Sequence, residues 1–327
     1  MSTGRITSAS RADSATLKRM TPAGRFYKPE LDCLRFLAFL GVFVRHSFPG
    51  EASYYAAHGF PVLLANLAAS TVRAGGFGVD LFFVLSAYLI TELLLREFDV
   101  YGTLHAGAFL VRRALRIWPL FFLFLAIAWI CDRYALATQG MTIGYIAAFL
   151  LFLGNWSCVL WGFPSSVAAL LWSVSIEEQF YLAWPFALSR LGRNRVLPAA
   201  LTLIFVAVIA RPLTVATGAA YPAVWCSTLC RLDTIAAGIL LALFMRRKAV
   251  AQVTHWPVTL VVCAALVWSV TEMAFPVGEQ RPWAISFSYP VVALASVGML
   301  VGALSLQGRT RELIVNRLTV YLVACTN

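Results

Sequence analysis

The chain has 327 residues, of which 60% are hydrophobic and only 13% are charged, and its formal net charge is +11. A soluble globular domain carries about 25% charged residues, so this composition and the mean hydropathy of +0.78 exclude one. Apolar windows of about 20 residues, enough to cross a hydrocarbon core about 30 Å thick, recur between short basic joints. We therefore expect an all-α, polytopic transmembrane helical bundle. No basic patch is interleaved with stacking aromatic residues, which argues against a nucleic-acid partner.

The two ends of the chain differ from its apolar middle. Residues 1–28 are polar and basic and contain no cleavable signal sequence, so we expect a disordered cytoplasmic tail. A transmembrane domain is expected over residues 29–306, followed by a cytoplasmic or truncated C-terminal segment, 307–327. The seven cysteines lie mostly in or beside apolar runs without metal-ligand spacing. They are expected to be packing residues, and we expect no metal site.

Nine apolar runs are candidate membrane spans, namely 31–49, 75–95, 114–133, 141–157, 168–189, 196–216, 224–245, 254–275 and 283–305. The positive-inside rule places the N-terminus and the basic joints in the cytoplasm. Three runs lie between Arg116 and Arg190, and three crossings would put these two residues on opposite sides. One run should therefore be re-entrant, interfacial or broken. We expect the irregularity in 141–172, which Gly154, Asn155, Gly162 and Pro164 interrupt, and a cavity near it, because irregular backbone at membrane depth needs cover.

The first run contains charged and titratable side chains inside an expected span. Arg35 and His46 are 11 positions apart, about three helical turns, so they share one face roughly 16 Å apart. Such residues usually face a bundle interior or a water-filled cavity. An imidazole can accept a proton from an alcohol, although His46 also fits a packing histidine. Arg45 points about 100° away and is expected at the membrane interface rather than in the same cavity.

Two further arginines and an aspartate stand out. Arg113 and Arg116 lie one turn apart where the chain enters the membrane, and their guanidinium groups suit phosphate binding or simple positive-inside anchoring. Asp80 is expected to neutralise an arginine rather than to take part in chemistry.

Two acidic residues lie in another apolar run. Glu177 can pair with an arginine or hold a substrate hydroxyl, and Glu178 points away from it on a helix. Arg231 and Asp233 form a weaker polar group.

Taken in order, these elements resemble the acyltransferase-3 family of integral membrane acyltransferases, which includes O-acetyltransferases of O-antigen, exopolysaccharide and Nod factors. The helix from Arg35 to His46 is similar to the family's Arg-x10-His helix. The segment from Gly78 to Thr91 is similar to the next one, with Ala87 where glycine is usual. The other matches are Arg113-x-x-Arg116 with Pro119, Trp172-Ser-Val-Ser-Ile-Glu177, and Arg231-Leu-Asp233 with Gly238.

The resemblance implies transfer of an acyl group, most often acetyl, from acyl-CoA to a hydroxyl of a carbohydrate. The acceptor would be a surface polysaccharide such as lipopolysaccharide, or a lipid-linked glycan. It also implies a multi-pass enzyme among the lipids of the plasma (inner) membrane, with acetyl-CoA as co-substrate and no permanently bound cofactor. The roles that we expect are His46 as general base, Arg35 as an orienting or charge-stabilising group, Glu177 as a structural or substrate-binding carboxylate, Arg113 and Arg116 as donor-phosphate ligands, and Asp80, Trp172 and Asp233 as supporting residues.

The sequence leaves two alternatives to this enzyme. A transporter or flippase would also line its path with intramembrane charges. An inactive, truncated family member would fit the C-terminus, because the resemblance implies a further span after residue 305 and the chain stops at Asn327.

Overall fold

A computed structural model describes residues 28–134, 141–218, 221–246, 256–274, 282–306 and 311–312. Helices joined by turns make up this part of the chain, with no β-strand in it, which confirms the predicted all-α class. The expected tail, apart from Lys28, lies outside the described residues, and so does most of the expected C-terminal segment.

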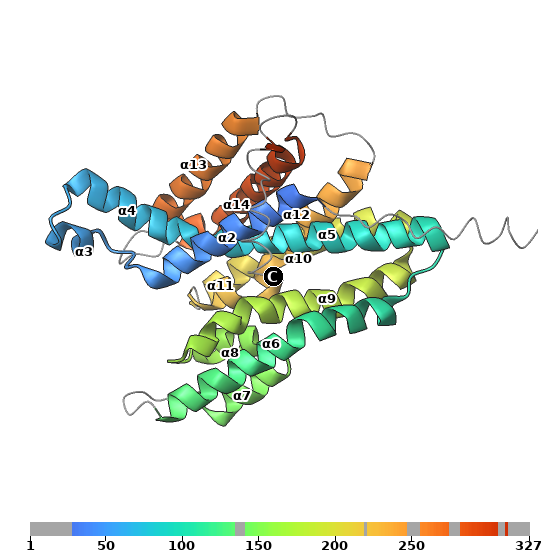
Figure 1. The fold of residues 1–327 in the computed structure, drawn as a ribbon, viewed down its shortest axis with the longest axis horizontal. Helices are drawn as coiled ribbons and strands as arrows, with labels where there is room; N and C mark the ends of the chain where they lie inside the picture. Colours follow the sequence, from blue (N-terminus) through green and yellow to red (C-terminus); the bar gives the residue numbers. More distant parts are fainter. Residues whose placement is uncertain are drawn as a thin grey trace, which may run out of the picture.

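The longer helices are α2 (Pro29–Ser47), α4 (Val62–Gly75), α5 (Gly78–Tyr101), α6 (Ala106–Tyr134), α9 (Trp172–Leu191), α10 (Val196–Ala216), α12 (Thr228–Arg246), α13 (Trp256–Ala274) and α14 (Pro282–Leu304). The short elements are α3 (Ala52–Ala57), α7 (Ile143–Leu150), α8 (Gly154–Trp161), α11 (Ala223–Cys226) and the 3-10 helices η1 (Val167–Leu171) and η2 (Arg193–Arg195). Figure 1 shows α2 and α5 in the middle of the molecule, with α13 and α14 on one side and α6 to α9 on the other.

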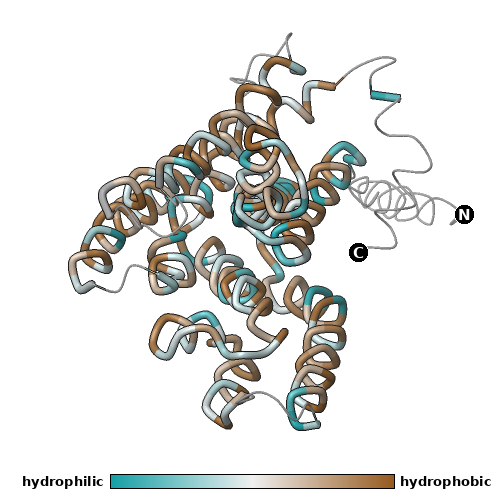
Figure 2. Tube along the Cα trace, turned by 90° about the vertical axis from the view of Figure 1, so that its left-hand side faces the viewer, coloured by the Kyte–Doolittle hydropathy of each residue, from teal (hydrophilic) through white to brown (hydrophobic). Residues whose placement is uncertain are grey.

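The helices carry hydrophobic residues along nearly their whole length (Figure 2). On α6, large side chains such as Leu115, Leu120 and Leu123 are exposed. A helix that is apolar on its outward face as well as its inward face is typical of a membrane span. The protein is therefore a multi-pass membrane protein whose outer helix faces are suited to lipid.

The predicted number of nine spans is not confirmed. Among the described residues, five helical stretches are long and apolar enough to cross a membrane, and Pro257–Met273 is a shorter apolar helix; the five are Val62–Tyr101, Ala106–Tyr134, Arg193–Ala216, Thr228–Arg246 and Ala284–Leu304. The helices α2 and α9 have a suitable length but carry several charged side chains. The predicted run 141–157 is divided between α7 and α8, which have eight residues each. Each is therefore only about 12 Å long and too short to cross.

The predicted irregularity in 141–172 is present. Between α7 and α8 the chain turns through Phe152, whose φ is 55°. The amide of Asn155 donates to the carbonyl oxygen of Cys226 (3.0 Å) and to the hydroxyl of Thr228 (2.9 Å), and it accepts from Gln179 (2.8 Å). Gln179 also donates to the carbonyl oxygen of Phe152 (2.7 Å). These bonds tie the break to α9, α11 and α12, and Gln179 gives the Phe152 carbonyl oxygen the protein partner that membrane depth requires.

With α7 and α8 too short to cross, α6 and α9 are the two long helices between Arg116 and Arg190. Arg193, after α9, pairs with Asp99 near the end of α5 (2.7 Å). Arg246, at the end of α12, pairs with the same Asp99 and with Glu92. The basic joints after these helices therefore lie at one end of the bundle.

Candidate active site

The helix α2 is uninterrupted from Pro29 to Ser47. Arg35 and His46 therefore keep the separation of about 16 Å that helical geometry predicts. At the Arg35 end, the guanidinium group donates to Oδ1 of Asp32 on the same helix (2.7 Å). This bond holds the arginine against α2 without removing all of its donors.

Three helices meet beside Arg35. On α9, the hydroxyl of Tyr181 donates to Oε2 of Glu177 (2.7 Å) and lies 3.1 Å from Oγ of Ser86 on α5. The guanidinium carbon of Arg113, on α6, lies 5.4 Å from the centre of the Tyr181 ring. Arg35 and Arg113 both act electrostatically on the Glu177 carboxylate.

Arg116 completes this group. Its side chain is exposed, and its charge interacts with those of Arg113 and Arg35. We call Arg35, Arg113 and Arg116 around Glu177 the arginine cluster. Motifs that are far apart in the sequence thus come together on α2, α6 and α9, and the cluster presents guanidinium donors of the kind that bind phosphate.

Glu178 points elsewhere, as its position next to Glu177 on a helix predicts. Its Oε2 accepts from the indole nitrogen of Trp118 on α6 (2.8 Å), while its Oε1 is buried without a hydrogen-bond partner in the described part of the chain. Glu178 therefore links α9 to α6 through Trp118, although the charge of Arg113 also acts on it.

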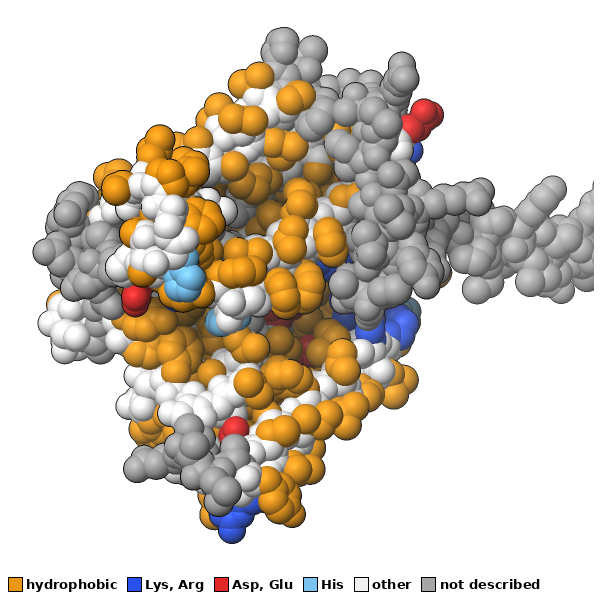
Figure 3. Space-filling view, turned by 60° about the vertical axis from the view of Figure 1, so that its left-hand side comes forward, with side chains coloured by type: hydrophobic (Ala, Val, Ile, Leu, Met, Phe, Trp, Pro, Cys, Tyr) orange, Lys and Arg blue, Asp and Glu red, His pale blue; other side chains and the backbone are white. Residues whose placement is uncertain are grey.

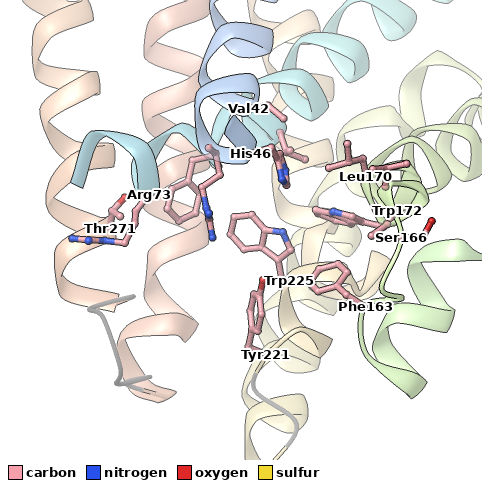
Figure 4. Close-up of a pocket in the computed structure, with 16 residues that line it drawn as sticks. Val42, His46, Arg73, Phe163, Ser166, Leu170, Trp172, Tyr221, Trp225 and Thr271 are labelled. Atoms are coloured by element: carbon pink, nitrogen blue, oxygen red, sulfur yellow. The ribbon is translucent and has the colours of Figure 1, made fainter. Parts of the chain in front are cut away.

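A cavity of about 780 Å³ lies at the other end of the α2 face. Figure 3 shows a wider hollow between hydrophobic walls, with acidic and histidine side chains in it and basic side chains at one end. The cavity is only part of this hollow, and its own lining holds no carboxylate among the described residues. The cavity is lined by His46 together with Trp172 and Trp225, whose rings are seen beside it in Figure 4. The ring of His46 makes no hydrogen bond to a described residue, so both of its nitrogens are available to a ligand.

Arg45 lines the same cavity, which corrects the expectation that it lies apart from His46. The reason is the length of its side chain and the small residue beneath it. A Cβ atom on Gly76 would lie 3.6 Å from Cγ of Arg45. The aliphatic part of the Arg45 side chain therefore passes over Gly76, where no side chain blocks it. The length of this side chain lets Arg45 reach the cavity although it leaves α2 in a different direction from His46.

The aromatic wall of the cavity rests on a buried ion pair. Asp80, expected to neutralise an arginine, accepts from Arg231 (2.6 Å), and neither side chain is exposed. The guanidinium carbon of Arg231 lies 4.5 Å from the centre of the Trp225 ring and 5.9 Å from that of Trp172. Asp80 and Trp172, two of the expected supporting residues, therefore meet at this wall.

Arg211 is a buried residue that the sequence motifs did not single out. It donates to Oδ2 of Asp233 (2.6 Å) and to the carbonyl oxygen of Cys230 (2.8 Å). The signal was present, because an arginine inside the apolar run 196–216 needs a buried partner.

Arg73 was also missed, because no helix was expected at 62–75. It lies in the last turn of α4 and lines the cavity. Its guanidinium group donates to the carbonyl oxygen of Gly50 (2.7 Å) and to Oε1 of Glu272 on α13 (2.5 Å).

Tyr221 adds a hydroxyl to the cavity from the segment between α10 and α11. Partial burial raises the pKa of Tyr221 above its usual value. Its hydroxyl is therefore protonated at neutral pH and available as a donor.

The comparisons with known proteins agree with these motifs. Residues 28–324 match the acyltransferase-3 family model, described as an acyltransferase domain. The peptidoglycan O-acetyltransferase OatA of Listeria monocytogenes is 32% identical over 179 residues, which are 52% of this chain and 25% of OatA. The putative peptidoglycan O-acetyltransferase YrhL of Bacillus subtilis is 34% identical over 174 residues, which are 50% of this chain and 24% of YrhL.

These matches thus cover about a quarter of the length of the relatives. No solved structure matches the chain. The family model, in contrast, extends over nearly all of the 327 residues. The chain belongs to the acyltransferase-3 family.

Proposed function

We propose that this protein is an O-acyltransferase that moves an acyl group, in the first place acetyl, from acyl-CoA to a hydroxyl of a carbohydrate. The observation that carries the proposal is the single face of α2, which joins the arginine cluster at one end to the cavity of His46 at the other. Relatives named as peptidoglycan O-acetyltransferases favour acetyl as the group and a cell-wall or other surface glycan as the acceptor.

The donor would bind at the arginine cluster. Coenzyme A carries several phosphate oxygens, and guanidinium groups bind phosphate through paired, charge-assisted hydrogen bonds. Arg113 and Arg116 supply such donors from adjacent turns of α6. Arg35 lies about 16 Å from His46. It therefore orients the phosphate groups of the donor rather than the thioester carbonyl that reacts at His46. The acyl-bearing arm would extend from the cluster toward the cavity.

The acceptor would bind in the cavity. His46 takes the proton of the acceptor hydroxyl as its oxygen attacks the thioester carbon. The carbon–sulfur bond then breaks, and the leaving thiolate receives the proton from His46. The products are an ester and free coenzyme A. Glu177 has a supporting role at the donor end, where Tyr181 fixes its carboxylate.

The proposed orientation follows from the basic joints. They lie at the end of the bundle that holds the arginine cluster, and the positive-inside rule places that end, with the N-terminus, in the cytoplasm. The donor would then bind from the cytoplasm, where coenzyme A is made, and His46 would face the outer side of the plasma membrane.

The test uses protein purified in detergent, with acetyl-CoA and an oligosaccharide acceptor. We expect transfer of acetyl to the oligosaccharide and a rate lower by about 10²–10⁴ in His46→Ala, because this change removes the general base. His58→Ala is the matched control, since His58 is exposed and its ring hydrogen-bonds only to the carbonyl oxygen of Tyr54 among the described residues. Full activity of His46→Ala would disprove the role of the base, and no transfer by the parent protein would disprove the function.

A further inference from the structure

The cavity beside His46 has a one-sided charge. Its lining contains Arg45, Arg73 and His46 and no carboxylate within the described part of the chain. Arg73 is paired with Glu272, but its Nε is buried without a hydrogen-bond partner among the described residues. Arg45 forms no ion pair with a described residue. Arg45 therefore gives the cavity a positive charge and N–H donors that no described residue satisfies, whereas the charge of Arg73 is already paired with Glu272.

The rest of the lining is largely aromatic. Trp172, Trp225, Phe163 and Tyr221 come from separate elements and line the space seen in Figure 4. Apolar, aromatic walls with a few polar groups are typical of small-molecule sites, and flat rings suit the apolar faces of a sugar. An occupant that uses both features is a sugar that carries a negative charge.

We propose that the cavity selects an anionic acceptor, a glycan with a carboxylate or a phosphate that binds Arg45, with a second cation, Arg73, in the same lining. The identification of this occupant as the acceptor rests on the proposed function. A guanidinium group binds either anion through short, charge-assisted hydrogen bonds, whereas a neutral hydroxyl gains less and a cationic sugar is repelled.

Arg45 is the residue that links this selection to the reaction. It is adjacent to His46 in the chain, and its charge acts on both His46 and Tyr221. An anion bound by Arg45 therefore brings a neighbouring hydroxyl of the same sugar toward the imidazole. Arg45 is a specificity-determining residue, while His46 remains the group that takes the proton.

The test is a binding measurement on the purified protein without acetyl-CoA. Three matched oligosaccharides are compared, one with a carboxylate, one with the methyl ester of that carboxylate and one with a phosphate monoester in its place. Quenching of tryptophan fluorescence reports binding, because Trp172 and Trp225 line the cavity. We expect the carboxylate or the phosphate to bind about tenfold more tightly than the ester. Equal affinity for all three oligosaccharides would overturn the proposal. If one anion is preferred, it shows whether the natural acceptor carries a carboxylate or a phosphate.

Three variants test whether the preference for the anion depends on Arg45 itself or only on the net charge of the protein. Arg45→Gln should remove the preference for the anion, and Arg45→Lys should keep part of it because the charge stays. Arg133→Gln should keep all of it, because Arg133 is an exposed arginine at the far end of α6, outside the cavity lining. A preference that survives in Arg45→Gln would overturn the role of Arg45. A tenfold loss of coenzyme A affinity in Arg45→Gln would also overturn it, because these cations would then bind the donor.

These outcomes are independent of the outcome for the proposed function. Tight binding of the anionic oligosaccharide without any acetyl transfer would disprove the function and leave the selectivity of the cavity in place. Equal transfer to the carboxylate and to its ester would support the function and disprove the selectivity.

Discussion

Arg231 on α12 donates to Asp80 on α5 across 2.6 Å, at a place where neither side chain is exposed. The arginine also lies 4.2 Å below the centre of the Tyr289 ring and 4.5 Å from that of Trp225. With Trp172, whose ring centre is 5.9 Å away, one buried ion pair thus supports aromatic residues from α9, α11 and α14. Because Trp225 lines the cavity of His46, the shape of the candidate site depends on this pair.

Removing one partner of this pair should destabilise the protein. Asp80→Asn leaves the Arg231 cation buried without its counter-charge, which costs about 3–5 kcal/mol. Thermal unfolding in detergent should show a clearly lower midpoint than for the parent. Glu51→Gln, a similar change at an exposed position, should have little effect. Removing both charges in Asp80→Asn/Arg231→Met should cost less than the two single changes together, and an unchanged midpoint for Asp80→Asn would contradict the role given to the pair.

Gly238 allows α12 to pack closely on α5. A Cβ atom at this position would lie 2.3 Å from the carbonyl oxygen of Val84 and 2.9 Å from the amide nitrogen of Tyr88, both backbone atoms. Gly238→Ala should therefore separate the helices and destabilise the protein by about 1–3 kcal/mol. Gly107→Ala is the control, because a Cβ atom there meets nothing within 4 Å and alanine favours the helix. If the two variants unfold alike, the close approach is not required.

The arginine cluster should affect the donor more than the acceptor. Arg113→Gln and Arg116→Gln each remove charge-assisted hydrogen bonds to phosphate, so each should raise the KM for acetyl-CoA about tenfold. The KM for the oligosaccharide should change little. Arg112→Gln, next to them on α6 and exposed, measures the effect of lost charge alone. A KM for acetyl-CoA that is equal in all three variants would show that the cluster does not bind the donor.

The bond between Trp118 and Glu178 should hold α6 against α9. Trp118→Phe removes the indole donor and leaves both oxygens of a buried carboxylate without a partner in the described part of the chain, which costs about 1–3 kcal/mol. In the background Glu178→Leu, the same change should cost less, because there is no carboxylate to satisfy. Unfolding midpoints of the four proteins in this double-mutant cycle give the coupling, and a coupling near zero would show that the bond adds no stability.

Parts of the fold follow from the sequence with good accuracy. The run 196–216 was expected as a helix and α10 has the same bounds, because a basic joint precedes it and Thr217 with Gly218 follows it. The break near Gly154 was expected from its residue types, and a Cβ atom there would lie 2.1 Å from the ring of Phe149. No span is expected between 49 and 75, where the structure has α4.

The sequence by itself determined the all-helical class, the break in 141–172 and the shared face of Arg35 and His46. These features depend on local chain geometry, since the length and period of a helix are set by neighbouring residues. Only the tertiary structure decided that Arg231 pairs with Asp80, 151 positions away in the chain. It also decided that Arg45 and Arg73 line the cavity of His46. Such contacts depend on how helices pack and how far a side chain reaches, and neither is encoded in the spacing along one helix.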